Sequence, residues 1–222
     1  MKIRITEQQC RNLLEARMEG FRLDVLMSAS SFSERVRYCT EMLGRPIGNG
    51  SSRVVFQVDD DCVIKLAKNP KGIAQNLEEL RVFGENYLSS TPKLFNGSDD
   101  ENGLWIITEY VLPAKASDFK KVLGITFKEI SEFAYCVDGS FKSNGRKYSI
   151  KMSELYEKYK DNDDVVDLLN NIHELEGTMD SSASDLTRLV NWGMCMRNGK
   201  PTFVFLDCGL NQEIFNKYYR RF

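Results

Sequence analysis

The spacing of apolar residues changes twice along the chain, from helical to strand-like and back, and these changes predict its organisation. Near the N-terminus, apolar residues recur at helical intervals over 10–18 and again over 36–43. Thr6 and Gln9 have the spacing of a capping box ahead of the first stretch, and Ser33 can cap the second. The N-terminal part is therefore predicted to be helical.

A strand-like pattern follows this helical part. The runs RVVFQV at 53–58 and CVIKLA at 62–67 are joined by an acidic turn, which predicts an antiparallel hairpin. PKLF and GLWIITEYV, on either side of a turn with Asn102-Gly103, predict two more strands. Between these two pairs of strands a helix is expected, with Asn69 as its cap and Pro70 at its first position.

Helical spacing returns after about residue 113. Apolar stripes predict helices over 127–137, 152–159 and 165–175, whereas GSFKSNGRKYSI at 139–150 is expected to form a surface hairpin or loop. Two β runs around Asn198-Gly199 predict a late hairpin.

The expected fold class is α+β in two lobes with an N-terminal helical extension. Its expected parts are the extension at 1–43, an antiparallel sheet with one helix at 44–112, and a mostly helical part with a hairpin at 113–222.

Composition narrows the function classes. The 222 residues are 42% hydrophobic, enough for a sizeable core, and the net charge of −2 argues against a general nucleic-acid binder. No apolar run approaches the roughly 20 residues that span a bilayer, so no membrane partner is expected. The six cysteines contain no C-x-x-C pair and His173 is the single histidine, so we expect a cytoplasmic protein with reduced, mostly buried thiols.

A glycine pair, Gly48 and Gly50, lies between two predicted strands in IGNGSSRVVF. Backbone amides next to glycine can approach a phosphate because no Cβ stands in the way. Val55, five residues beyond Gly50, is placed to cap an adenine ring. An ordinary glycine-rich hairpin turn is the alternative.

Lys65 lies in the middle of an apolar strand, on the face it shares with Val63. If both faces of that strand are packed, Lys65 needs an anion; otherwise it is an exposed lysine on an edge strand. On the following helix, Glu79 flanks the apolar stripe and can reach back to the lysine. Glu78 points nearly away from that stripe and is expected to be solvated.

Asp207 ends the run FVFLD and is followed closely by Gly209, a position suited to holding Mg²⁺, which prefers oxygen ligands. Asp185 and Asn191 precede the same hairpin and can supply a base and a second metal ligand. A turn-capping role for Asp207 is the alternative.

In this order and spacing, the features resemble the protein-kinase superfamily over residues 44–212. IGNGSSRVV matches three of the four marked positions of G-x-G-x-x-G-x-V, CVIK resembles the V-A-I-K strand, WIITEYV resembles the strand into the interlobe hinge, and LDCGL resembles D-F-G. The resemblance implies a two-lobed protein-kinase-like fold with a reduced C-terminal lobe.

The resemblance also implies roles for individual residues. Lys65 would position the phosphates of ATP with Glu79 as its ion-pair partner, and Asp207 would hold Mg²⁺ together with Asn191. Asp185 would act as the catalytic base. The remainder of the implied nucleotide site comprises Gly48, Gly50, Val55, Val63, Thr108 as gatekeeper, and Glu109 to Val111 along the adenine edge.

The chain departs from the family pattern at several positions. Arg53 replaces the third glycine, which either opens the turn over the phosphates or adds a cation. Ala183-Ser184-Asp185 replaces H-R-D, and Asn191 lies six residues beyond Asp185 where the pattern has five. Only thirteen residues follow Gly209, too few for an activation segment and the helices that grip a peptide.

The favoured function is an Mg-ATP-dependent phosphotransferase acting on a hydroxyl of an unknown protein or small molecule. A pseudokinase or structural module, which binds nucleotide or a partner without catalysis, is the alternative, and transfer of AMP from the same pocket is a third possibility. GSSR, GIAQN, SDLTR and NWG look like segments of small kinase-like proteins of bacteriophages. That narrower resemblance implies a phage or host protein partner, and a place in the host cytoplasm or the virion.

Overall fold

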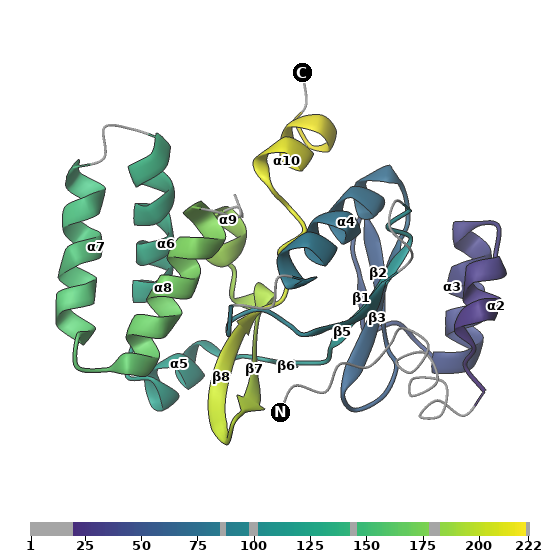
Figure 1. The fold of residues 1–222 in the computed structure, drawn as a ribbon, viewed down its shortest axis with the longest axis horizontal. Helices are drawn as coiled ribbons and strands as arrows, with labels where there is room; N and C mark the ends of the chain where they lie inside the picture. The colour runs from purple at the N-terminus through teal and green to yellow at the C-terminus, as the bar shows by residue number, and fades with distance from the viewer. Residues whose placement is uncertain (1–19, 85–87, 98–101, 143–145, 178–182, 221–222) are drawn as a thin grey trace. The chain divides into compact units, whose positions relative to one another are not determined.

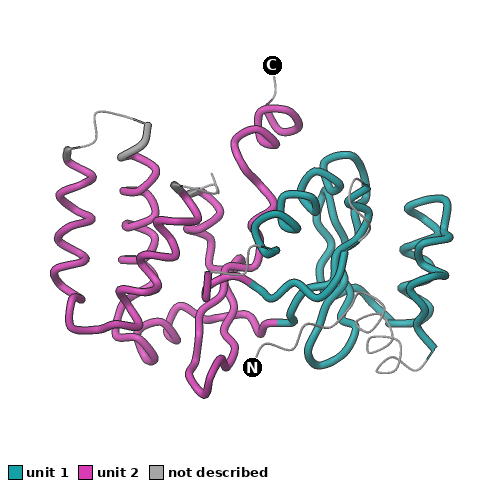
Figure 2. Tube along the Cα trace, in the orientation of Figure 1, with its two compact units in different colours: residues 1–85, 92–110 teal, residues 86–91, 111–222 magenta. Residues whose placement is uncertain are grey.

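The computed structural model describes residues 20–84, 88–97, 102–142, 146–177 and 183–220. The predicted first helix, with its capping box at Thr6, lies outside these ranges. The chain is a mixture of helices and antiparallel sheet that divides into two compact units. Unit 1 comprises residues 1–85 and 92–110, and unit 2 comprises residues 86–91 and 111–222 (Figure 2).

Unit 1 is built on an antiparallel sheet that contains the predicted hairpin and the two predicted later strands. The central strand, β3, pairs with β2 on one side and with β5 on the other. The strands, in sheet order, are β1 (Gly48–Asn49), β2 (Arg53–Gln57), β3 (Cys62–Ala67), β5 (Trp105–Glu109) and β4 (Leu94–Gly97).

One face of this sheet is apolar and is covered by the helices α2 (Leu23–Ser28) and α3 (Phe32–Leu43), which lie side by side (Figure 1). Side chains two residues apart on a strand share a face, and cross-strand neighbours share it too. The buried cluster on this face follows that rule and includes Val54, Phe56, Cys62, Ile64, Leu66, Trp105 and Ile107 from the strands, with Phe21, Leu23, Leu26 and Cys39 from the helical side.

The N-cap of helix α3 lies two residues before the predicted cap. Ser31, and not Ser33, is the N-cap: its hydroxyl accepts from the Glu34 amide, and the Glu34 carboxylate accepts from the Ser31 amide. The prediction was wrong because Ser31 has the acidic residue three positions on that completes a capping box. Gly44 ends the helix as expected, with a positive φ of 84°.

The opposite face of the sheet meets α4 (Pro70–Gly84). The predicted cap is confirmed, because Asn69 Oδ1 accepts from the Gly72 amide at 3.2 Å and Pro70 occupies the first helical position. Gly72 brings this first turn close to the hairpin: a Cβ there would lie 2.2 Å from the carbonyl oxygen of Ser52. The absence of a side chain at Gly72 therefore allows α4 to lie close to the turn between β1 and β2, which contains Ser52.

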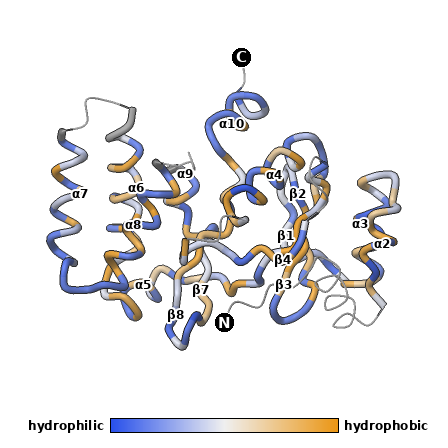
Figure 3. The backbone as a smooth tube through the Cα atoms, in the orientation of Figure 1, coloured by the Kyte–Doolittle hydropathy of each residue, from blue (hydrophilic) through white to orange (hydrophobic). Residues whose placement is uncertain are grey.

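Unit 2 holds the rest of the helices and a second antiparallel sheet in the order β6-β7-β8. Its elements are β6 (Leu112–Pro113), α5 (Ala116–Val122), α6 (Phe127–Lys142), α7 (Arg146–Tyr159), α8 (Asp163–Gly177), α9 (Ala183–Leu186), the 3₁₀ helix η1 (Leu189–Asn191), β7 (Trp192–Arg197), β8 (Lys200–Phe205) and α10 (Gln212–Tyr218). Apolar and polar positions alternate along α6 and α8, as expected of amphipathic helices (Figure 3).

The prediction of a hairpin or long loop over 139–150 was wrong. Helix α6 continues to Lys142 and α7 begins at Arg146. At Gly139 the two helices come close together, because a Cβ there would lie 2.9 Å from the ring of Tyr148. The missing side chain lets α7 pack against α6.

The late hairpin of β7 and β8 is confirmed, with positive φ values of 51° at Asn198 and 78° at Gly199. Its aromatic residues pack around the Phe119 ring, which is stacked on Phe203 at 3.9 Å. The segment 88–91 also belongs to this unit. Arg197 donates to the carbonyl groups of Ser89 and Thr91, and the Phe205 amide donates to that of Ser90.

The described cysteines are free thiols, and four of them are buried: Cys39, Cys62, Cys136 and Cys208. This agrees with the expected burial of the thiols. Within the described ranges, no helix combines the length and apolar character needed to cross a membrane.

A test of the α4 contact compares two glycines of the same helix. Gly72→Ala should lower the free energy of unfolding by about 1–3 kcal/mol, because the new methyl group overlaps the Ser52 backbone. Gly84→Ala should be neutral or slightly stabilising, since a Cβ at Gly84 meets nothing within 4 Å. Urea unfolding followed by circular dichroism measures both; equal stabilities would contradict the close approach.

Candidate functional site

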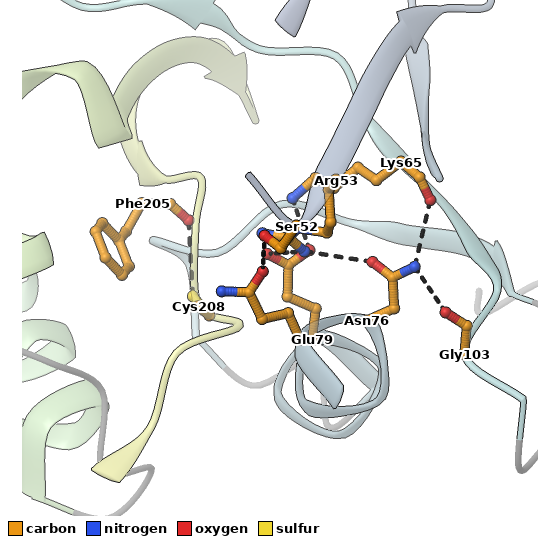
Figure 4. Close-up of polar contacts among 9 residues, drawn as sticks. Ser52, Arg53, Lys65, Asn76, Glu79, Gly103, Phe205 and Cys208 are labelled. Carbon is orange, nitrogen blue, oxygen red and sulfur yellow. Dashed lines mark hydrogen bonds and ion pairs between the residues drawn. The ribbon is translucent and has the colours of Figure 1, made fainter. Parts of the chain in front are cut away.

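Lys65 and Glu79 form a buried ion pair between β3 and α4, as their positions in the sequence predict. Lys65 Nζ lies 2.6 Å from Glu79 Oε2, and the two side chains are 9% and 0% exposed (Figure 4). Since β3 is the central strand and is buried on both faces, Lys65 is not an edge-strand lysine. The ammonium group also lies 5.4 Å from the centre of the Phe83 ring.

Arg53 joins this ion pair from the neighbouring strand. Its Nη1 lies 2.9 Å from Glu79 Oε1, in an ion pair, and 3.4 Å from Asn76 Oδ1. Arg53 is itself 9% exposed. One buried carboxylate therefore bridges two cationic side chains, each on its own oxygen. Arg53 therefore adds a second cationic side chain beside Lys65.

The glycine hairpin between β1 and β2 is fastened to the start of α4. Lys68 Nζ donates to Asn49 Oδ1 and to the Gly50 carbonyl, both at 2.9 Å. Asn69 Nδ2 donates to the Ser51 carbonyl at 3.0 Å. The Ser52 carbonyl accepts from the Lys68 amide at 2.8 Å. Several carbonyl groups of the turn thus face the residues that follow β3.

Neither Gly48 nor Gly50 is required by the fold. A Cβ at Gly48 would come no closer than 3.5 Å to Val55, and one at Gly50 would come no closer than 3.7 Å to Arg53. Neither has a φ in the left-handed region. The absence of both side chains leaves space that the protein's own packing does not use.

The predicted apolar lining lies on the same face of the sheet as Lys65. Val55 is directly opposite Lys65 on β2, and Val63 is directly opposite Thr108 on β5. Thr108 is buried. Glu109 falls on the other face and accepts from the Lys93 amide at 3.2 Å. Val111 belongs to unit 2, where it is buried against Gly193.

Unit 2 brings Asp185, Asn191 and Asp207 together. Asn191 Nδ2 donates to the Asp185 carbonyl at 3.1 Å, and the Asn191 carbonyl accepts from the Leu206 amide at 2.8 Å. Asp185 is on α9, and Asp207 lies just beyond the end of β8. Nearby, Cys208 Sγ is 3.8 Å from the Phe205 carbonyl (Figure 4). The β7–β8 hairpin lies between Asn191 and Asp207 in the sequence, and it therefore brings Asp207 back towards Asn191 and Asp185.

The electrostatic surroundings of Asp185 favour its protonated form. Burial raises the pKa of its carboxyl above the ordinary value, and the negative charge of Asp207 raises it further. Arg188 opposes this shift from 3.6 Å away. Two carboxylates that interact in this way are a common arrangement at functional sites.

The donor atoms of this cluster fit Mg²⁺ better than a softer metal. Among the described residues no group of three His, Cys, Asp or Glu side chains gathers into a metal site. Magnesium does not need one, because it is commonly held by one or two carboxylates together with waters and substrate phosphates. Asp207 and the amide oxygen of Asn191 are residues of the right type.

The expectation that Glu78 is solvated was wrong. Its side chain is 10% exposed and lies 2.6 Å from Arg81 Nη2. The helical angle places Glu78 away from the apolar stripe. Its carboxylate is nevertheless largely covered, because it pairs with Arg81 three positions further along the helix. Asn76, within α4, and Lys68, just before it, were not predicted as partners of the site, because neither residue has a distinctive spacing in the sequence.

Comparisons with known proteins leave the family open. No protein-family profile matches the chain, and no curated protein does. Among solved structures, one match is the streptomycin–ATP–APH(2″)-IIa ternary complex, which is 13% identical over 82% of this chain and 71% of that chain, with a TM-score of 0.36. A likeness of this size does not establish a shared fold.

The shared carboxylate is tested by a comparison of two adjacent glutamates. Glu79→Gln should lower the free energy of unfolding by about 3–5 kcal/mol, because it removes the carboxylate from two buried cations. Glu78→Gln should cost about 1 kcal/mol or less, since its partner Arg81 is half-exposed. Chemical denaturation measures both changes, and a similar cost at the two positions would argue against a special role for Glu79.

A second test uses the raised pKa of Asp185. Because the folded protein binds this proton more tightly than the unfolded chain, the stability associated with it is full at low pH and is lost as pH rises through the raised pKa. Asp185→Asn removes that loss. The variant should therefore melt at a higher temperature than the wild type at pH 7, with the difference shrinking towards pH 3. A difference that grew on acidification would contradict the assigned direction.

Proposed function

We propose that the protein binds Mg-ATP and transfers a phosphoryl group to a hydroxyl, with a kinase-like arrangement of its site residues. The buried Lys65–Glu79 ion pair carries this proposal. A lysine on the central strand, fixed by a helix glutamate next to a glycine hairpin, is suited to holding phosphates rather than to stabilising a core. The two glycines that the fold does not need support the same conclusion.

Each group would have a separate task at the nucleotide. Lys65 would hold phosphate oxygens as a fixed cation, and backbone amides of the glycine hairpin would approach them without a Cβ in the way. Asp207, with Asn191, would hold Mg²⁺. When bound, that ion neutralises charge that develops on the phosphates.

Asp185 would orient the attacking hydroxyl and take up its proton. A carboxylate with a raised pKa is a better proton acceptor than an ordinary one at neutral pH. Its attachment through Asn191 would keep it beside Asp207. The hydroxyl would belong to a small molecule or to a protein, and transfer of AMP in place of the phosphoryl group uses the same set of residues.

A non-catalytic nucleotide-binding module, docking to a protein of a phage or its host, is the second candidate. The contact of Arg53 with Glu79 favours it, because Arg53 draws on the same carboxylate that would otherwise hold Lys65 alone. In this case Asp185 would only cap the turn ahead of the hairpin.

Label transfer from ATP decides between the two candidates. Mg-ATP should raise the melting temperature of the wild type and of Asp185→Asn alike, by an amount equivalent to about 2.7 kcal/mol at a hundred times the dissociation constant. Transfer of label from γ-labelled ATP into small-molecule or protein acceptors of a cell lysate should fall about 10²–10⁴-fold in Asp185→Asn. Label carried over from α-labelled ATP would instead indicate AMP transfer.

Two results would go against the proposal. Protein that binds Mg-ATP but transfers no label from either position would favour the non-catalytic module. A melting temperature that does not change at millimolar ATP, with or without Mg²⁺, would exclude both candidates.

A further inference from the structure

Arg53 occupies a distinctive position on the sheet. It is the first residue of β2 and lies on the same face as Val55, whose cross-strand neighbour is Lys65. It directly follows the glycine hairpin, at the point where the family pattern has a third glycine. A side chain here is therefore directed to the same face of the sheet as the Lys65 ammonium group.

The surroundings of Arg53 fix its guanidinium group beside that ammonium. Asn76 Nδ2 donates to the Gly103 carbonyl at 2.8 Å and to the Lys65 carbonyl at 3.4 Å, so the amide oxygen of Asn76 is turned towards Arg53 (Figure 4). Glu79 then holds Arg53 on one carboxylate oxygen and Lys65 on the other. Two contacts from α4 to Arg53 and one to Lys65 therefore hold the two cationic groups next to each other.

Arg53 and Lys65 share the single carboxylate of Glu79, so the three side chains keep one net positive charge, which favours an anionic ligand beside them. Charge-assisted hydrogen bonds to phosphate are about twice as strong as neutral ones, and arginine presents several N–H groups in a planar fork that matches phosphate oxygens. Lysine adds a point charge. Together they suit a ligand with several phosphate groups better than one with none.

We propose that Arg53 is a second phosphate-binding residue, which shares the phosphates of the bound nucleotide with Lys65. This inference rests on the proposed function. Arg53 and Lys65, both paired with Glu79, would hold the phosphates together. Loss of Lys65 would then weaken nucleotide binding without abolishing it. It also makes the number of phosphates on the ligand the main determinant of affinity.

A purely structural role for Arg53 predicts a different pattern. If Arg53 served only as a counter-ion for Glu79, its removal would disturb the sheet and weaken every ligand alike. A phosphate-binding role affects ATP and spares adenosine. The ratio of ATP affinity to adenosine affinity therefore separates the two roles.

The experiment measures Mg-ATP and adenosine binding by titration calorimetry for the wild type, Arg53→Gln, Lys65→Gln and the double variant. Arg53→Gln should weaken ATP binding about 10- to 100-fold, the worth of a lost hydrogen bond between charged groups, and leave adenosine binding unchanged. Lys65→Gln should behave in the same way, and the double variant should bind ATP more weakly than either single variant, with adenosine binding still unchanged. Arg81→Gln, on the same unit but paired with Glu78, is the control for loss of one positive charge and should bind both ligands as the wild type does.

The outcomes distinguish this inference from the proposed function. Wild-type protein that is folded but does not bind ATP would overturn both. Wild-type protein that binds ATP, with an unchanged ratio of affinities in Arg53→Gln, would overturn the role of Arg53 alone. Folding is checked by circular dichroism without ligand. If Arg53→Gln does not fold, Arg53→Gly, which restores the glycine of the family pattern, gives the decisive ratio.

Discussion

Unit 1 depends on one constraint, the need of a buried carboxylate for positive partners. Glu79 is fully buried on α4, and it is compensated by Lys65 on β3 and Arg53 on β2. A buried charge without a partner costs several kcal/mol, so the contacts with Lys65 and Arg53 favour the observed position of α4 on the sheet. Gly72 permits the required distance at the other end of the helix, because a larger residue would meet the Ser52 backbone. The position of the helix thereby determines the shape of the glycine hairpin.

Several residues of the candidate site contribute little to the stability of the fold. Gly48 and Gly50 give no packing of their own, and burial makes the charged form of Asp185 less favourable. By contrast, the apolar face of the unit 1 sheet is filled by buried apolar residues at every second position of its strands. Proteins commonly give up local stability at the residues they use for chemistry.

Much of the architecture could be predicted from periodicity and turn chemistry, whereas contacts that depend on neighbouring elements could not. The strand alternation around Lys65 and the helical angle of Glu79 predicted their meeting, and Asn198-Gly199 predicted the hairpin. The segment 139–150 was predicted wrongly because its helices are supported by a contact between elements, that of Gly139 with Tyr148. The direction of Arg53 follows from the register of β2, which the sequence does not specify, and the proximity of Asp185 to Asp207 depends on how the hairpin folds back. Glu78 shows the same limit, since an angle on a helix does not reveal what covers it.

The segment 88–91 has a consequence for synthesis on the ribosome. It lies between two elements of unit 1, yet its partner Arg197 is 108 residues further along the chain from Ser89. At about 5–20 residues per second, that distance takes roughly 5–20 seconds to translate. The sheet of unit 1 can form during this time, because its strands lie within residues 48–109. The contacts of residues 89–91 with Arg197 and Phe205 can form only after the second hairpin has been synthesised, so unit 2 is completed after all strands of unit 1 are available.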